Sequence, residues 1–187
     1  MEVNEALPEY KRYTYEDYCS WDDDKRWELI DGIPYAMSAP SRRHQEISRE
    51  LLVQFHSFLK GKSCKVYAAP FDVRLDADTY DDTVLQPDLL VVCDESKLDD
   101  RGCVGAPDMV AEILSPSTAM LDKHLKFNHY LRSGVREYWI VDPDSNTVTT
   151  YILKNGEYVA HAYGSDAAIP VHVLEGCSID MAEIFAE

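Results

Sequence analysis

Two acidic residues lie within short apolar runs that are typical of buried strands. Glu112 stands inside the run from Met109 to Leu114, and Asp88 stands inside the run from Val84 to Val92. A carboxylate in a buried strand is costly unless a metal ion, a basic side chain or its own proton compensates it. Two such strands side by side would bring Asp88 and Glu112 together.

A basic residue, Lys126, follows Glu112 on the next predicted helix. Two carboxylates with an ammonium group nearby suit a hard divalent cation such as Mg²⁺, which prefers a few carboxylate oxygens and keeps several waters. An ion in such a site lowers the pKa of a bound water and neutralises charge on a phosphoryl oxygen. The ammonium group would orient that water or stabilise the charge of the transition state.

Each of these residues also has a purely structural interpretation. Asp122 lies four residues before Lys126, and an exposed pair at this spacing stabilises a helix by about 0.3–0.5 kcal/mol. Asp108 shares a strand face with Glu112 and is a rival partner, although it stands at the start of the strand, where a solvated acid costs little. His44 lies on the apolar stripe of its predicted helix, where packing is its more common role.

The pattern of apolar residues predicts the elements that position these side chains. Asp31-Gly32 and Asn155-Gly156 separate apolar runs, and such steps are typical of hairpin turns. The hairpin strands are predicted over 27–30, 33–37, 148–153 and 158–163. The other strands are predicted over 64–69, 71–75, 84–93, 109–114 and 137–141. Helices are predicted over 15–21, 42–59, 118–133 and 179–185. The strand, helix and strand over 109–141 predict a right-handed crossover with parallel pairing.

Length and composition fit a single α/β domain over residues 1–187. The five cysteines are odd in number and widely spaced, so we expect reduced thiols rather than a disulfide framework or a zinc ribbon. No apolar run is long enough to span a membrane and no targeting pattern is present, so we expect a cytoplasmic protein with no membrane partner. The net charge of −16 counts against nucleic acid, although basic residues cluster locally, for example around Arg43.

Longer motifs resemble the Uma family, whose members are described as putative restriction endonucleases and which belongs to the PD-(D/E)XK nuclease superfamily. The matching stretches are Trp27–Gly32, His44, Pro87-Asp88, Glu112–Thr118, Asp122–Lys126 and Gly134–Pro143. The resemblance covers a core of about residues 13–163. It implies an α/β (α+β) fold with a restriction-endonuclease-like mixed β-sheet flanked by helices, to which the turn residues add the N- and C-terminal β-hairpins. It also implies hydrolysis of DNA phosphodiester bonds that depends on Mg²⁺, with Mn²⁺ as a substitute ion.

The resemblance also assigns roles to individual residues. Asp88 is the acid of the Pro-Asp motif, Glu112 is the acid of the (D/E)XK motif, and the backbone carbonyl of Ile113 is a further metal ligand. Glu28 is an additional acid from the N-terminal part of the chain. His44 and Ser115 are weaker candidates, which would orient the metal ligands without binding the ion themselves.

The chain departs from the superfamily pattern at the lysine of the (D/E)XK motif. Leu114 occupies that position, and Lys126 is the residue that matches the relocated lysine of the family. This departure keeps a second interpretation open, in which the fold serves as a catalytically inactive nucleic-acid-binding or protein-interaction module. A metal-dependent hydrolase of RNA or nucleotides is a third possibility. For the leading interpretation we expect a homodimer, because two active sites allow both DNA strands to be cut.

Overall fold

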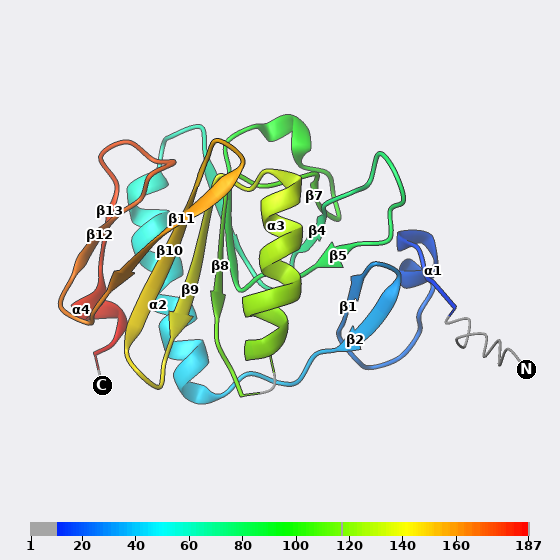
Figure 1. The fold of residues 1–187 in the computed structure, drawn as a ribbon, viewed down its shortest axis with the longest axis horizontal. Coiled ribbons are helices and arrows are strands. Elements are labelled where there is room, and N and C mark those ends of the chain that lie inside the picture. The colour runs from blue at the N-terminus through cyan, green and yellow to red at the C-terminus, as the bar shows by residue number, and fades with distance from the viewer. Residues whose placement is uncertain (1–10, 117, 187) are drawn as a thin grey trace, which may run out of the picture.

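A six-stranded mixed sheet forms the centre of the fold in this computed structural model, which describes residues 11–116 and 118–186 (Figure 1). Its strands, in spatial order, are β11 (Glu157–Tyr163), β10 (Thr147–Lys154), β9 (Glu137–Asp142), β8 (Met109–Ile113), β6 (Leu89–Val92) and β3 (Lys65–Ala68). β8 and β9 are parallel, as the strand–helix–strand pattern predicts, and the other pairs are antiparallel. The predicted mixed sheet is therefore confirmed.

Helices cover both faces of this sheet. Successive side chains of a strand point to opposite faces, and α2 (Arg42–Leu59) packs Leu51 and Phe55 against the face that carries Ala111. α3 (Phe127–Ser133) packs Tyr130 against the opposite face, which carries Val110. Among the described residues, no helix combines the length and the apolar character needed to cross a membrane.

Two smaller sheets complete the fold. A five-stranded sheet has the order β2 (Ile33–Ala36), β1 (Trp27–Ile30), β5 (Val84–Leu85), β4 (Asp72–Arg74) and β7 (Gly102–Val104). A two-stranded sheet consists of β12 (Ala168–Pro170) and β13 (Ser178–Asp180). The helical elements outside the main layers are α1 (Tyr15–Cys19), the 3₁₀ turn η1 (Glu95–Lys97) and α4 (Met181–Ile184).

The largest departure from the predicted elements lies at the strand over 84–93. It is two strands, because β5 belongs to the five-stranded sheet and β6 to the central one. Pro87 stands between them and has no N–H to donate to a ladder, which explains the break. Asp88 thus lies at the junction of the two sheets, immediately before β6.

Other departures concern short elements. β7 and the β12–β13 pair were not predicted, because strands of three residues are too short to show a clear alternation. The helix expected over 179–185 starts only at Met181, since β13 occupies the preceding residues, and the helix expected over 15–21 ends at Cys19. The helix expected over 118–133 starts at residue 119 and contains a π-helical turn, η2 (Leu121–Lys126), before it continues as α3; residue 117 lies outside the described residues.

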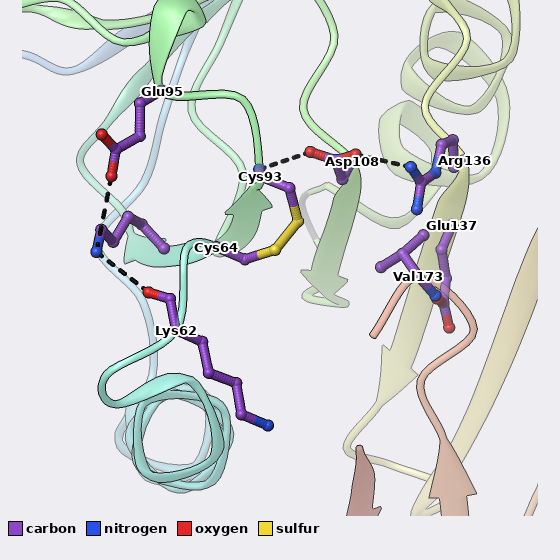
Figure 2. The surroundings of a disulfide bond; sticks show 9 residues. Lys62, Cys64, Cys93, Glu95, Asp108, Arg136, Glu137 and Val173 are labelled. Carbon is purple, nitrogen blue, oxygen red and sulfur yellow. Dashed lines mark hydrogen bonds and ion pairs between the residues drawn. A yellow bond between two sulfur atoms is a disulfide. The ribbon is translucent and has the colours of Figure 1, made fainter. Parts of the chain in front are cut away.

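A buried carboxylate ties the C-terminal segment to the central sheet. Glu137 on β9 is fully buried, and its two oxygens accept hydrogen bonds from Trp139 Nε1 at 2.8 Å and from the backbone N of Val173 at 2.9 Å. Figure 2 shows Glu137 beside Val173. Burial raises the pKa of Glu137, while these hydrogen bonds oppose the shift. Glu137 is thereby accounted for as a structural acid.

The expectation that all cysteines are reduced is wrong, because Cys64 and Cys93 form a disulfide (Figure 2). They are 29 residues apart in sequence, a spacing that carries no signal on its own. The antiparallel register of β3 and β6, which pairs Lys65 with Val92, places the two cysteines opposite each other. The backbone N of Cys93 donates to Asp108 Oδ2 at 2.7 Å, and Asp108 Oδ1 lies 3.1 Å from Arg136 Nη1.

The disulfide predicts a specific thiol count. In denaturant without reductant, a thiol reagent should detect three thiols per chain, from Cys19, Cys103 and Cys177, and five after reduction. Because the bond closes a loop of 29 residues, Cys93→Ser should lower the free energy of unfolding by about 3.6 kcal/mol. The exposed Cys19→Ser is the control and should leave stability unchanged. Detection of all five thiols without reductant would contradict the pairing.

Candidate active site

The two strand acids lie next to each other at the junction of the sheets. β6 and β8 are antiparallel neighbours with Leu89 opposite Ala111, and this register brings Asp88 to Glu112. The backbone N of Asp88 donates to Glu112 Oε2 at 3.4 Å, and the backbone N of Ile113 donates to Asp88 Oδ2 at 2.8 Å. The predicted adjacency is confirmed, whereas the roles of the two acids remain predictions.

Lys126 lies at the centre of a cluster of buried carboxylates. Its Nζ is 2.9 Å from Glu28 Oε1, 3.0 Å from Glu112 Oε1 and 3.3 Å from Asp122 Oδ1. The side chains of all four residues are at most 4% exposed. The structural interpretation of Asp122 and Lys126 as an exposed helix pair is therefore wrong, because both groups are buried.

The π-helical turn η2 explains how one segment supplies several groups to the same point. A π-helical turn holds more residues than an α-helical one, and such turns are frequent at functional sites. Within η2, Lys126 contacts Glu112 and Asp122 contacts Lys126, while Tyr130 follows on α3 and donates from its hydroxyl to Glu112 Oε1 at 2.8 Å. Tyr138 OH donates to the carbonyl of Asp122 at 3.1 Å, which helps to hold this turn.

The three carboxyl groups of the cluster share the single ammonium group of Lys126. Burial raises the pKa of Glu112 well above its ordinary value; Lys126 opposes this, whereas Asp122, Asp88 and Glu28 add to it. Burial alone would lower the pKa of Lys126, but Glu112, Glu28 and Asp122 outweigh it and raise that pKa well above the ordinary value. Lys126 therefore stays charged, whereas burial and the neighbouring acids favour the protonated form of Glu112.

His44 contacts Asp88 rather than serving only as a packing residue. It lies in the first turn of α2, whose N-cap Ser41 accepts from the backbone N of His44 at 3.2 Å. His44 Nε2 is 3.1 Å from Asp88 Oδ2. Burial lowers the pKa of His44, but the hydrogen bond and charge of Asp88 outweigh it, so that the pKa is raised. His44 thus fixes the orientation of the Asp88 carboxylate.

Ser115 and Leu114 shape the segment between β8 and η2. Ser115 Oγ lies 3.0 Å from Thr118 Oγ1 and accepts from the backbone N of Thr118 at 3.3 Å, so it organises the turn that leads into η2. Leu114 is 9% exposed and packs in the apolar cluster that includes Val110 and Tyr130. Leu114 cannot supply a charge, and the structure places the Lys126 ammonium beside Glu112 instead.

The rival pair, Asp108 with Glu112, is not brought together. Asp108 is bonded to Cys93 and Arg136 near the disulfide, at the opposite end of β8 from Glu112. Two residues of the site were missed by sequence analysis. Asp122 had a signal in its spacing from Lys126, but nothing in the sequence showed that Tyr130, an apolar position of the predicted helix, would direct its hydroxyl at Glu112.

The site opens onto a cavity of about 570 Å³. Asp88, Glu112 and Lys126 line it together with the N-terminal half of α2 and Ser115. In the described part of the chain, no three His, Cys, Asp or Glu side chains converge closely enough to hold a metal ion by themselves. A metal ion here would need a backbone carbonyl and waters to complete its coordination.

Comparison with known proteins identifies the family. The family model Uma2, described as "Putative restriction endonuclease", matches residues 13–182. This chain belongs to that family. The match extends the resemblance seen in the sequence through the C-terminal sheet.

Similar proteins carry names that agree with this family or leave function open. The uncharacterized protein slr1290 of Synechocystis is 29% identical over an alignment that covers 76% of this chain and 75% of its own length. The uncharacterized protein sll1609 of the same organism is 26% identical over 62% of this chain and 65% of its own length. A crystal structure titled as a putative nuclease belonging to DUF820, from Anabaena variabilis, has a TM-score of 0.75 at 21% identity and covers 92% of this chain and 97% of its own. That likeness supports the nuclease-like mixed α+β fold.

The buried cluster predicts a strong dependence of stability on Lys126. Lys126→Met keeps the length of the side chain but leaves Glu28, Glu112 and Asp122 buried without their counter-charge, so it should lower the free energy of unfolding by about 3–5 kcal/mol. The control is Lys123→Met, which removes the same charge from an exposed position of the same turn. Urea denaturation measures the free energy of unfolding of both variants. Equal values would show that Lys126 does not stabilise the buried carboxylates.

Proposed function

We propose that this protein is a Mg²⁺-dependent endonuclease that hydrolyses phosphodiester bonds in DNA. The observation that carries the proposal is the contact of the buried Lys126 ammonium with Glu112, one strand away from Asp88, in the wall of a cavity. Membership of a family described as restriction endonucleases supports it.

The donor groups fit a magnesium ion. Asp88 and Glu112 offer carboxylate oxygens from adjacent strand positions, and the Ile113 carbonyl would add a further oxygen. Mg²⁺ prefers such oxygens and retains several waters. Glu28, Glu112 and Asp122 outnumber the single Lys126 ammonium, and a bound divalent cation would favour the ionised form of Glu112. When bound, Mg²⁺ or its substitute Mn²⁺ would activate the attacking water and neutralise charge on the phosphoryl oxygens.

The remaining residues would position this centre. Lys126 and Tyr130 both bind Glu112 Oε1, which leaves Oε2 on the side of Asp88. Lys126 also lines the cavity, so its ammonium would offset the negative charge that develops on the attacked phosphate, in place of the lysine missing at Leu114. Glu28, on β1 of the five-stranded sheet, would hold Lys126 in position.

One observation favours the alternative of a catalytically inactive module that binds nucleic acid or protein. Both oxygens of Glu112 already accept hydrogen bonds, from Lys126 and Tyr130 on one side and from the backbone of Asp88 on the other. An acid whose oxygens are satisfied within the protein has less need of a metal ion. Metal binding therefore separates the two functions more directly than a search for the right DNA sequence.

Calorimetric titration with Mn²⁺ and Mg²⁺ tests the proposal. The wild-type protein should bind, and Asp88→Asn and Glu112→Gln should each abolish binding, because each removes a charged ligand. Asp108→Asn, on the same strand face but bonded elsewhere, should bind like wild type. The wild type should also nick supercoiled plasmid DNA with Mg²⁺, and both ligand variants should lose this activity. Absence of divalent binding by the wild type would rule out the metal-dependent nuclease and favour the inactive module.

We further propose a homodimer, because cleavage of both DNA strands is simplest with two active sites. β11 is the edge strand of the central sheet and most of its residues are exposed, so the C-terminal hairpin is available for the interface. Light scattering should give about twice the chain mass of 21.3 kDa. Val159→Asp, at an exposed apolar position of β11, should shift the protein towards the monomer; a monomeric wild type at assay concentrations would contradict the dimer.

A further inference from the structure

Two arginines in the cavity wall have no role in the centre described so far. Arg26 precedes β1, Arg43 lies in the first turn of α2, and both line the cavity that contains Asp88 and Glu112. The chain has 34 acidic and 18 basic residues, so carboxylate partners are abundant. Several other arginines do pair with one: Arg42 with Glu46, Arg49 with Glu50, Arg74 with Asp81 and Arg136 with Asp108.

Arg26 is held by a neutral amide instead. Its Nε and Nη2 donate to Gln86 Oε1 at 3.1 and 2.7 Å. Gln86 is buried, and its amide nitrogen donates to Tyr18 OH at 2.9 Å and to Asp72 Oδ1 at 2.8 Å, which leaves the amide oxygen facing Arg26. The backbone N of Gln86 donates to Glu28 Oε1 at 2.8 Å, so the same residue links Arg26 to the Lys126 cluster.

Arg43 is also held by neutral oxygens. Its Nη1 donates to the carbonyl of Ala186 at 3.0 Å, and its Nη2 donates to the carbonyl of Phe185 at 2.9 Å and to Asn146 Oδ1 at 3.3 Å. Within residues 11–116 and 118–186, no carboxylate is recorded at ion-pair distance from either Arg26 or Arg43.

Neutral acceptors fix a guanidinium group without cancelling its charge. A carboxylate would both orient and neutralise it, whereas an amide or carbonyl oxygen leaves the positive charge available to an anion. Arginine is the side chain whose planar donors best match a phosphate. Arg26 is also not required to balance Glu28, because Lys126 already lies 2.9 Å from that carboxylate.

We propose that Arg26 and Arg43 each bind a phosphate of a polynucleotide backbone that lies in this cavity, beside the phosphodiester presented to Asp88 and Glu112. The proposal rests on the proposed function and refines its substrate class. Two arginine sites in addition to the acidic centre suit a chain of phosphodiesters rather than a mononucleotide. They also explain how a protein of net charge −16 can hold a polyanion, since the positive charge is local.

The test is the salt dependence of DNA binding, which does not require knowledge of the target sequence because phosphate contacts are independent of sequence. Binding of a labelled duplex of arbitrary sequence is followed by fluorescence anisotropy in EDTA, where no hydrolysis occurs. Each phosphate contact contributes about −0.9 to the slope of log K against log salt concentration. Arg26→Gln and Arg43→Gln should each make the slope shallower by about 0.9 and weaken binding about tenfold at 0.1 M salt.

Matched variants separate phosphate binding from a structural role. Arg42→Gln removes the same charge next to Arg43, from an exposed residue paired with Glu46, and should keep the wild-type slope. Arg26→Lys retains the charge and should keep most of the slope. Thermal unfolding of each variant confirms that it is folded before its slope is compared.

A further pair of variants tests Arg43 without removing it. Asn146→Asp places a carboxylate at the atom that now accepts from Arg43, in a positive-φ position that Asp tolerates. It should neutralise Arg43 and make the slope shallower, whereas Ser145→Asp adds the same charge one residue away and should do so less. If Arg43 served only to anchor the C-terminal segment, Asn146→Asp would change the slope no more than Ser145→Asp.

The outcomes distinguish this proposal from the proposed function. Slopes of Arg26→Gln and Arg43→Gln equal to wild type, or no binding by wild type at any salt concentration, would overturn it even if plasmid is cleaved. A shallower slope in both variants, together with no divalent-ion binding by the wild type, would support it while refuting the metal-dependent endonuclease.

Discussion

The burial of the Lys126 ammonium among Glu28, Glu112 and Asp122 is the interaction on which the site depends. The three acids come from β1, β8 and η2, which are far apart in the sequence and belong to two sheets and a helical turn. A buried charge is costly unless it is paired and hydrogen-bonded. The cluster is therefore stable only when these three elements are assembled together. The charged groups in the cavity wall thus take up their positions only in the folded protein.

The break at Pro87 is what allows the two sheets to meet there. β5 ends in the five-stranded sheet, β6 begins in the central sheet, and Gln86, Pro87 and Asp88 cross between them. The backbone of Gln86 binds Glu28, and the next residues bring Asp88 beside Glu112. A continuous strand over this segment would place Asp88 within a single sheet and would separate Glu28 from Lys126. The Pro-Asp step thus has an architectural role as well as a chemical one.

The sequence predicts most of the central sheet and the acids of the site, because apolar alternation and turn residues are local signals. The hairpins at Asp31-Gly32 and Asn155-Gly156 and the helix α2 follow from such signals. The Cys64–Cys93 bond, the bond from Tyr130 to Glu112 and the neutral anchoring of Arg26 depend instead on strand register and on tertiary packing. The position of Lys126 needed a motif comparison, because spacing alone equally predicts an exposed pair with Asp122.

The most direct test of the account is the location of a bound ion. Anomalous scattering from crystals grown with Mn²⁺ would show whether the ion is held by Asp88, Glu112 and the Ile113 carbonyl. We predict a peak in contact with these groups, with Lys126 still bound to Glu112. A peak elsewhere, or none at saturating Mn²⁺ with Asp88 and Glu112 unchanged, would contradict the assignment of these acids as metal ligands.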